Sequence, residues 1–186
     1  RRPGNDLPHH RVQRQGPRPL GLARLVASGE MKLWIDADAC PAPVKEIVLR
    51  ASERLQRPVV FVANKPIQVP RSPRISTVHV AKGLDVADAH IAEHAQAGDL
   101  AVTQDIPLAA SLVKKGVVTI DVRGEPFTEE NIDERLSLRN FYQELRESGV
   151  ATEGPRAFAP QDRQRFASTL DRELSRLTRA AEAKRT

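Results

Sequence analysis

The sequence predicts an α/β fold in three layers, with helices on both faces of a mostly parallel, Rossmann-like sheet. Two observations indicate this class. Short, continuously apolar segments such as "VVFVA" (59–63) are typical of strands that are buried on both faces. Segments of helical length lie between these strands, and strands that alternate with helices are typical of parallel sheets.

The predicted elements alternate from residue 32 onward. Strands are expected at 32–36, 59–63, 75–81, 100–103 and 117–122, and helices at 41–56, 85–98 and 106–116. Gly98 and Gly116 end the last two helices, because glycine readily takes the left-handed conformation that follows a helix.

A C-terminal helical extension is predicted over residues 128–180. Thr128 is a candidate N-cap for a helix that runs through 147 along an apolar face, and Gly149 lies beyond its end. That face holds Ile132, Leu136, Phe141 and Leu145. The last helix carries a stripe at helical spacing, which predicts packing against the domain. Its members are Phe166, Leu170, Leu174 and Leu177. We expect one domain over 31–180 and a frayed tail at 181–186.

Composition indicates a globular protein: 40% of the 186 residues are hydrophobic and 28% are charged. No apolar run approaches the roughly 20 residues that a transmembrane helix needs. Cys40 is the only cysteine, which excludes an internal disulfide and fits a reducing compartment. We therefore expect a cytoplasmic protein without a membrane partner.

The net charge of +5 is concentrated near the start of the chain. Residues 1–30 contain six arginines and two acids, a net of +4, which leaves +1 for the remainder. This Arg-, Pro- and Gly-rich stretch predicts a disordered basic leader. Met31 is the only methionine, so we expect translation to start there and the leader to be extraneous. Because the remainder is nearly neutral, attraction to nucleic acid would depend on local clusters.

Aspartates follow the predicted strands at the edge where ligands bind. Asp36 ends the first strand, Asp38 comes two residues later, and Asp105 comes two residues after "LAVT". In open parallel sheets, ligands bind outside the carboxyl ends of the strands. We therefore expect these three carboxylates to gather at one edge.

The helix predicted at 85–98 adds two more acids. Asp88 shares a stripe with Ile91 and Ala95, and Asp85 lies at its margin. A carboxylate that faces the sheet needs a partner, because an unpaired buried charge is costly. A cation shared with the strand-end acids would supply one, as would a buried Arg or Lys. Taken singly, Asp105 and Asp85 are also good helix caps, and Asp38 can close a turn.

Carboxylate oxygens favour Mg²⁺ or Mn²⁺ over zinc or copper. His90 and His94 are four residues apart on the polar helix face, which is more typical of surface residues than of ligands. Cys40 lies among carboxylates, which disfavour its thiolate, so we expect it to be a packing residue.

Several motifs resemble the YaiI/YqxD family of bacterial proteins, whose function is uncharacterised. They are "MKLWIDADACPAPVK", "GLDVADAHI", "VTQDIPLAA", "RGEPFTEENI", "EGPRAF" and "DRQRFASTLDREL", in this order from Met31 to about Leu177. The resemblance implies a fold similar to PIN-like domains, which are metal-dependent nucleases. It implies that Asp36 is the first-strand acid, Asp85 or Asp88 the helix acid, and Asp105 the acid after "VT". The "DAD" followed by Cys-Pro departs from the usual PIN opening.

The preferred functional hypothesis is hydrolysis of phosphodiesters, most plausibly in RNA, with one or two Mg²⁺ or Mn²⁺ ions. Asp36, Asp88 and Asp105 are the predicted catalytic and metal-binding residues, with Asp38 and Asp85 as additional ligands. Thr103 and Gln104 are candidates to orient water. Candidate phosphate contacts follow strands at the same edge: Lys65, Lys82 and Arg123. For Lys65 and Lys82, ordinary solvated charge is the competing interpretation.

Two alternatives remain open. "LWIDADAC" superficially resembles the opening of haloacid-dehalogenase-type phosphatases, in which Asp36 would be the nucleophile and Asp38 an acid/base. Cys40 stands where that opening has Thr or Val. The other alternative is a metal- or RNA-binding protein without turnover, although one Trp, one Tyr and five Phe offer few surfaces for base stacking.

Overall fold

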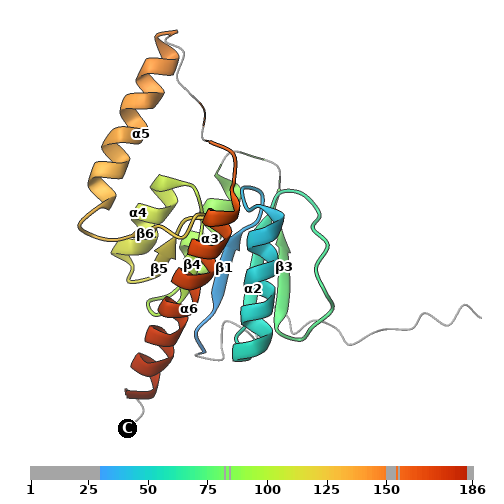
Figure 1. Ribbon diagram of the computed structural model, residues 1–186. Coiled ribbons are helices and arrows are strands. Elements are labelled where there is room, and N and C mark those ends of the chain that lie inside the picture. Colours follow the sequence, from blue (N-terminus) through green and yellow to red (C-terminus); the bar gives the residue numbers. More distant parts are fainter. Residues whose placement is uncertain (1–29, 82, 84, 150–153, 155, 184–186) are drawn as a thin grey trace, which may run out of the picture.

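The computed structural model describes residues 30–81, 83, 85–149, 154 and 156–183. In these parts of the chain six strands form one sheet in the order β3-β2-β1-β4-β5-β6 (Figure 1). The first five strands are parallel: β1 (Leu33–Asp36), β2 (Val59–Ala63), β3 (Ile75–His79), β4 (Leu100–Val102) and β5 (Val118–Ile120). The short β6 (Pro126–Phe127) is antiparallel to β5. The predicted mostly parallel sheet is confirmed.

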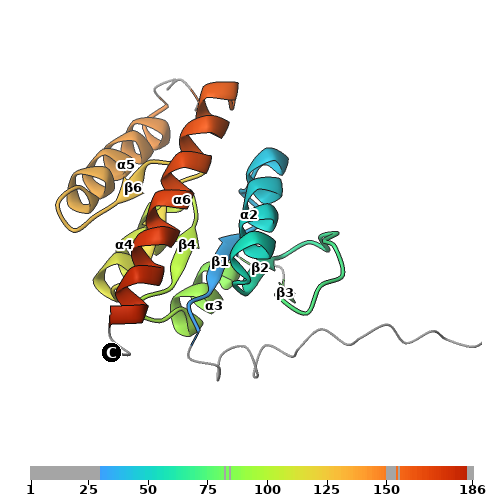
Figure 2. The same ribbon diagram turned by 60° about the horizontal axis from the view of Figure 1, so that its bottom comes forward.

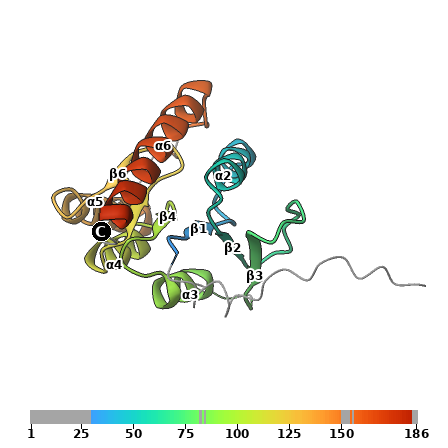
Figure 3. The same ribbon diagram turned by 90° about the horizontal axis from the view of Figure 1, so that it is seen from below.

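Helices cover both faces of this sheet, as Figures 2 and 3 show. One face carries α2 (Ala42–Leu55) and α6 (Pro160–Ala183), and the other carries α3 (Val86–His94) and α4 (Ile106–Lys114). The remaining helix, α5 (Ile132–Glu147), packs against α4. The three-layer arrangement and the C-terminal helices are therefore as predicted.

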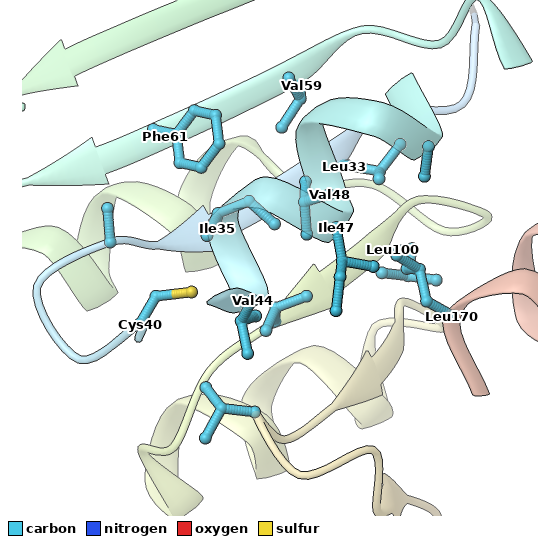
Figure 4. Close-up of a cluster of buried hydrophobic side chains, with 14 of the residues drawn as sticks. Leu33, Ile35, Cys40, Val44, Ile47, Val48, Val59, Phe61, Leu100 and Leu170 are labelled. Atoms are coloured by element: carbon cyan, nitrogen blue, oxygen red, sulfur yellow. The ribbon is translucent and has the colours of Figure 1, made fainter. Parts of the chain in front are cut away.

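Alternate strand residues pack toward α2 and α6. Leu33 and Ile35 of β1 join Val44, Val48 and Leu170 in one buried cluster (Figure 4). Cys40 is 6% exposed in the same cluster, and burial raises the pKa of its thiol to about 12. The prediction of a packing cysteine is confirmed.

Trp34 lies on the opposite face of β1 and is completely buried. Its Nε1 donates to Asp99 Oδ2 over 3.0 Å, and Lys32 N donates to Asp99 Oδ1 over 2.9 Å. The rings of His90 and His94 have their centroids 6.4 Å from the indole. Asp99 thus accepts hydrogen bonds from groups at the start of β1. Asp36 lies at the other end of this strand.

Some element boundaries differ from the prediction. The last parallel strand is shorter than 117–122, and after a turn Pro126–Phe127 form the antiparallel β6. Helix α3 ends at His94, because Ala95 has extended backbone angles. Helix α5 begins at Ile132 with Asn131 as its N-cap, so Thr128 does not cap it. Phe141 is 54% exposed, so it does not belong to the buried face of that helix.

The final helix is fixed at its start by a buried aspartate. Asp162 is 1% exposed and accepts from Arg123 Nη1 over 2.6 Å, from Arg156 Nη1 over 2.8 Å and from Ala159 N over 2.9 Å. These bonds, that of Arg156 above all, lower the pKa of Asp162 to about 2. They join α6 to the turn between β5 and β6. The helix extends to Ala183, so three residues of the predicted frayed tail are helical.

Gly124 lies in the β5–β6 turn with φ +82°, directly beneath α6. A Cβ atom there would lie 2.7 Å from the backbone of Phe166. Only glycine allows this approach without displacement.

None of the helices in the described ranges is both long enough and apolar enough to cross a membrane.

Candidate functional site

The order of the strands creates a crevice at the carboxyl edge of the sheet. Strand β1 lies between β2 and β4, so the chain leaves β1 toward one side and reaches β4 on the other. Connections that diverge in this way leave a crevice between them, where ligands of open α/β sheets bind.

A pocket of about 330 Å³ occupies this position. Residues from the turns after β1, β2 and β4 and from the start of α3 surround it. The lining residues are Asp36, Asp38, Ala39, Asn64, Gly83, Asp85, Ala87, Asp88, Gln104 and Asp105. The structure therefore brings all five predicted acids to one pocket, although their roles as ligands stay a prediction.

Asp36 is the innermost of these acids. It ends β1, and only 7% of it is exposed. Thr103 Oγ1 donates to its Oδ2 over 3.1 Å, and the backbone N–H of Ala39 also donates to this carboxylate. Burial raises the pKa of Asp36 despite these donors, and the charges of Asp38 and Asp105 raise it further.

Asp105 is both a helix cap and a pocket residue. Its Oδ1 accepts from Leu108 N over 2.7 Å at the start of α4, so the capping interpretation is confirmed. Its own N–H donates to Thr103 Oγ1 over 3.0 Å. The same side chain lines the pocket, so capping does not exclude it from the site.

The turn that carries Asp38 is held from both sides. Asp38 Oδ2 accepts from Asn64 N over 2.7 Å, which joins the turn to the end of β2. On the other side, Gln104 Nε2 donates to the carbonyl of Ala39 over 2.7 Å. Gln104 thus spans the crevice between the β1 and β4 turns. Its predicted role in orienting water stays a prediction.

Helix α3 contributes the remaining two acids. Asp88 is half-buried, and burial, followed by the charges of Asp105, Asp36, Asp85 and Asp38, raises its pKa to about 6. Asp85 is exposed at the start of the helix with φ +61°, and its side chain makes no capping hydrogen bond. Asp85 therefore occupies the predicted N-cap position of α3, but it caps the helix through its backbone carbonyl and not through its side chain.

The negative charge of the pocket has no basic counterpart among the described lining residues. Repulsion of this kind is relieved by protonation or by a bound cation. The acids are spread around the pocket: in the described ranges, no group of three or more His, Cys, Asp or Glu side chains is arranged so that it holds an ion directly.

The three basic residues predicted to contact phosphate do not lie together around the pocket in the described structure. Lys65 is exposed and follows the pocket residue Asn64, without lining the pocket itself. Arg123 binds Asp162 and the carbonyl of Arg156, so its guanidinium helps to join α6 to the β5–β6 turn. Lys82 lies outside the described residues.

Sequence reasoning missed Asn64 as a pocket residue. It follows the last residue of β2 and lies two positions beyond Val62, which is the register partner of Asp36. Applying the strand-end rule to amide side chains as well as to carboxylates would have identified it.

The fold and this pocket define an α/β protein with an acidic site at the carboxyl edge of a parallel sheet. A sequence model of the uncharacterised bacterial YaiI/YqxD family matches residues 34–176, which is more than half of the chain. The chain therefore belongs to the YaiI/YqxD family.

Curated bacterial relatives agree with this assignment. The UPF0178 protein of Myxococcus xanthus is 64% identical over 149 residues, which cover 80% of this chain and 97% of that protein. The UPF0178 protein of Syntrophobacter fumaroxidans is 58% identical over 146 residues, covering 78% and 95%. That of Trichlorobacter lovleyi is 57% identical over 151 residues, covering 81% and 98%.

Proposed function

We propose that the protein is a Mg²⁺- or Mn²⁺-dependent phosphodiesterase that acts on RNA. The observation that carries this proposal is the convergence of Asp36, Asp88 and Asp105 on one pocket without a described basic residue in its lining. Burial and mutual repulsion raise the pKa values of Asp36 and Asp88, so a cation would relieve a real electrostatic cost.

The donor set fits a hydrated magnesium ion. Mg²⁺ usually keeps several of its waters and binds proteins through one or two carboxylates, with the substrate phosphate completing the shell. Carboxylates that are spread around a pocket of about 330 Å³ suit such an ion, because water fills the space between oxygen and metal. A direct cage of three or more side chains, which the described residues lack, is not required.

The residues of the pocket would have different roles in binding the ion and the substrate. Asp36 and Asp105 in the β1 and β4 turns and Asp88 in α3 would hold the ion, no more than two of them directly and the rest through its waters. Asp38 and Asp85 would bind its waters. When bound, the ion would supply an activated water and offset charge on the leaving oxygen. Exposed Lys65, which follows Asn64 at this edge, would contact a substrate phosphate.

The choice of RNA rests on the resemblance to PIN-like nucleases. The phosphatase alternative would require Asp36 to attack phosphorus, but this carboxylate is 7% exposed and is hydrogen bonded to Thr103. Trapping a phosphoryl group on Asp36 would nevertheless favour that alternative over ours. A protein that binds cations without any turnover would match the non-catalytic alternative.

The test is cleavage of labelled RNA and DNA with Mg²⁺, with Mn²⁺ or with EDTA. We expect cation-dependent cleavage of RNA, and a loss of at least about 100-fold in Asp36→Asn and Asp105→Asn, which is the size of effect seen when one preorganised electrostatic group is removed from an active site. Asp133→Asn is a matched control, because Asp133 is exposed in the first turn of α5. Cleavage that persists unchanged in both pocket variants would indicate a contaminant and refute the proposal.

A further inference from the structure

Helix α5 carries apolar side chains that the described parts of the chain leave uncovered. Among the described residues, the large hydrophobic side chains that are exposed are Leu138, Phe141 and Tyr142, and all three lie on this helix. The rings of Phe141 and Tyr142 are in edge contact, with their centroids 5.8 Å apart. Figure 1 shows α5 at the periphery of the molecule, with its C-terminal half away from the sheet. Apolar side chains that gather on a surface in this way indicate an interaction site.

These side chains form one stripe along the helix. Four apolar residues fall within an arc of about 100° when a helix has 3.6 residues per turn: Leu138, Phe141, Tyr142 and the partly buried Leu145. The buried Ile132 lies about 120° from Leu138 around the helix axis, on the side that packs against α4. The α5 stripe therefore faces away from α4 and is open to another molecule.

Opposite charges border the α5 stripe near its C-terminal end. Glu144 and Arg146 precede and follow Leu145, so they project about 100° to either side of it and lie about 3 Å apart along the axis. Both are exposed, and neither side chain has a hydrogen-bond or ion-pair partner within the part of the chain that the structure describes. One border of the stripe is thus acidic and the other is basic.

A second copy of the same helix would match both borders at once. In a parallel pair around a twofold axis, the acidic border of each helix faces the basic border of the other, so Arg146 meets Glu144 of the second copy and Glu144 meets its Arg146. In an antiparallel pair each border faces itself, which brings Arg146 close to Arg139 of the second copy, on the same side of the helix. Complementary charges beside an apolar seam determine which helices pair and in which orientation. They favour the parallel pair here.

We propose that the α5 stripe binds the α5 stripe of a second copy, so that two chains form a parallel, twofold-symmetric dimer. Helices that pack in this manner cross at about 20°. With the contact centred on Phe141 and Leu145, the crossing separates the two copies of Glu134, which lies beside the stripe at the start of α5. One helix face offers fewer residues than the roughly 20–30 a side of a stable complex, so the dimer is weak and reversible.

Sedimentation velocity of the full chain, from low micromolar to near-millimolar concentration, tests for the dimer. It requires neither cation nor substrate, so its result does not depend on the proposed function. We expect the mean mass to rise from that of one chain toward that of two. Phe141→Ser should weaken association at least about 10-fold, because a few central aromatic side chains carry most of the binding energy of an interface. A monomer at every concentration, or a dimer that Phe141→Ser leaves unchanged, would overturn the proposal.

Two charge reversals test the parallel arrangement. Glu144→Arg and Arg146→Glu each place like charges at both bridges, so each variant alone should associate roughly 10-fold more weakly. An equimolar mixture of the two has opposite charges at both bridges and should associate as the unaltered protein does. Glu147→Arg is the matched control, because it makes the same change of charge on the side of α5 opposite the stripe, where association should be unaffected.

Two results would contradict this arrangement. If Arg146→Glu alone dimerised more strongly than the unaltered protein, its new carboxylate would be meeting Arg139 in an antiparallel pair. If the mixture associated no better than either variant alone, the bridges between Glu144 and Arg146 would not exist. Either result overturns the proposal.

Discussion

The surroundings of Asp88 in the folded protein disfavour the ionised form of its carboxyl group. Burial comes first among the causes that raise its pKa to about 6 from an ordinary 3.8, and four other aspartates add to it. The folded protein therefore holds this proton more tightly than the unfolded chain does. The resulting stabilisation is complete below about pH 3.8 and is lost as the pH rises through about 6.

We expect Asp88→Asn to stabilise the cation-free protein near neutral pH. The amide keeps the size of the side chain and removes the repelled charge, so the free energy of unfolding should rise by about 1 kcal/mol, after allowance for partial exposure. Thermal unfolding in EDTA at about pH 7.5 measures the effect. Asp133→Asn should not raise the midpoint, because a carboxylate in the first turn of α5 is favoured by the helix dipole. An Asp88→Asn midpoint at or below that of the unaltered protein would contradict the account.

Among individual residues, the sequence predicted the acids of the pocket but not the groups that bind to them. Asp36, Asp88 and Asp105 were identified because strand ends and helical periodicity can be recognised in the sequence itself. Arg123 was assigned to phosphate because its partner Asp162 is 39 residues away, and pairing over such a distance leaves no local signal. Asn64 lines the pocket at a strand end, where only carboxylates were predicted, and its bond to Asp38 comes from a backbone N–H, which any residue has.

The elements after β5 show where local patterns fail. Thr128 has the character of a cap, yet Asn131 accepts from Thr128 N over 3.0 Å and donates to the carbonyl of Pro126 over 2.9 Å. These side-chain bonds hold residues 128–131 in a turn. Helix α5 therefore begins at Ile132 and not directly after Thr128. The alternation of buried strands and helices was predicted correctly because its periodicity extends over many residues.

The close approach of α6 to the β5–β6 turn makes a prediction about Gly124. We expect Gly124→Ala to destabilise the protein by about 1–3 kcal/mol, because the methyl group would overlap the backbone of Phe166. Chemical unfolding measures this value.

Gly149→Ala is the control for backbone strain in that experiment. Gly149 has φ +81°, much like Gly124, but a Cβ atom there would have nothing within 4 Å. The two variants therefore share the cost of the positive φ and differ in the overlap with α6. Equal losses of stability would show that α6 does not constrain the turn.

For the molecule as a whole, the important feature is that acids distant in the chain share one crevice. The turns after β1 and β4 meet because these strands are neighbours in the sheet, although 67 residues separate Asp36 from Thr103. An unfolded chain does not hold these carboxylates together. A cation that binds the pocket would therefore bind the folded state preferentially and stabilise it.

We accordingly expect Mn²⁺ to raise the midpoint of thermal unfolding at about pH 7.5 and to lose this effect at about pH 5. Ligands must be deprotonated to bind a metal, and Asp88, with its pKa of about 6, is mostly protonated at the lower pH. Scanning calorimetry with Mn²⁺ and with EDTA at both pH values measures the difference. An equal gain at the two pH values would exclude Asp88 as a ligand.

The burial of Trp34 at the centre of the sheet provides an optical probe. It is the only tryptophan of the chain, and the one tyrosine is exposed on α5, so emission excited at the red end of the absorption band comes from β1. An indole shielded from water, as that of Trp34 is, emits at shorter wavelength than one in water. Unfolding would shift this emission to the red, so fluorescence can follow the loss of the central strand without a label.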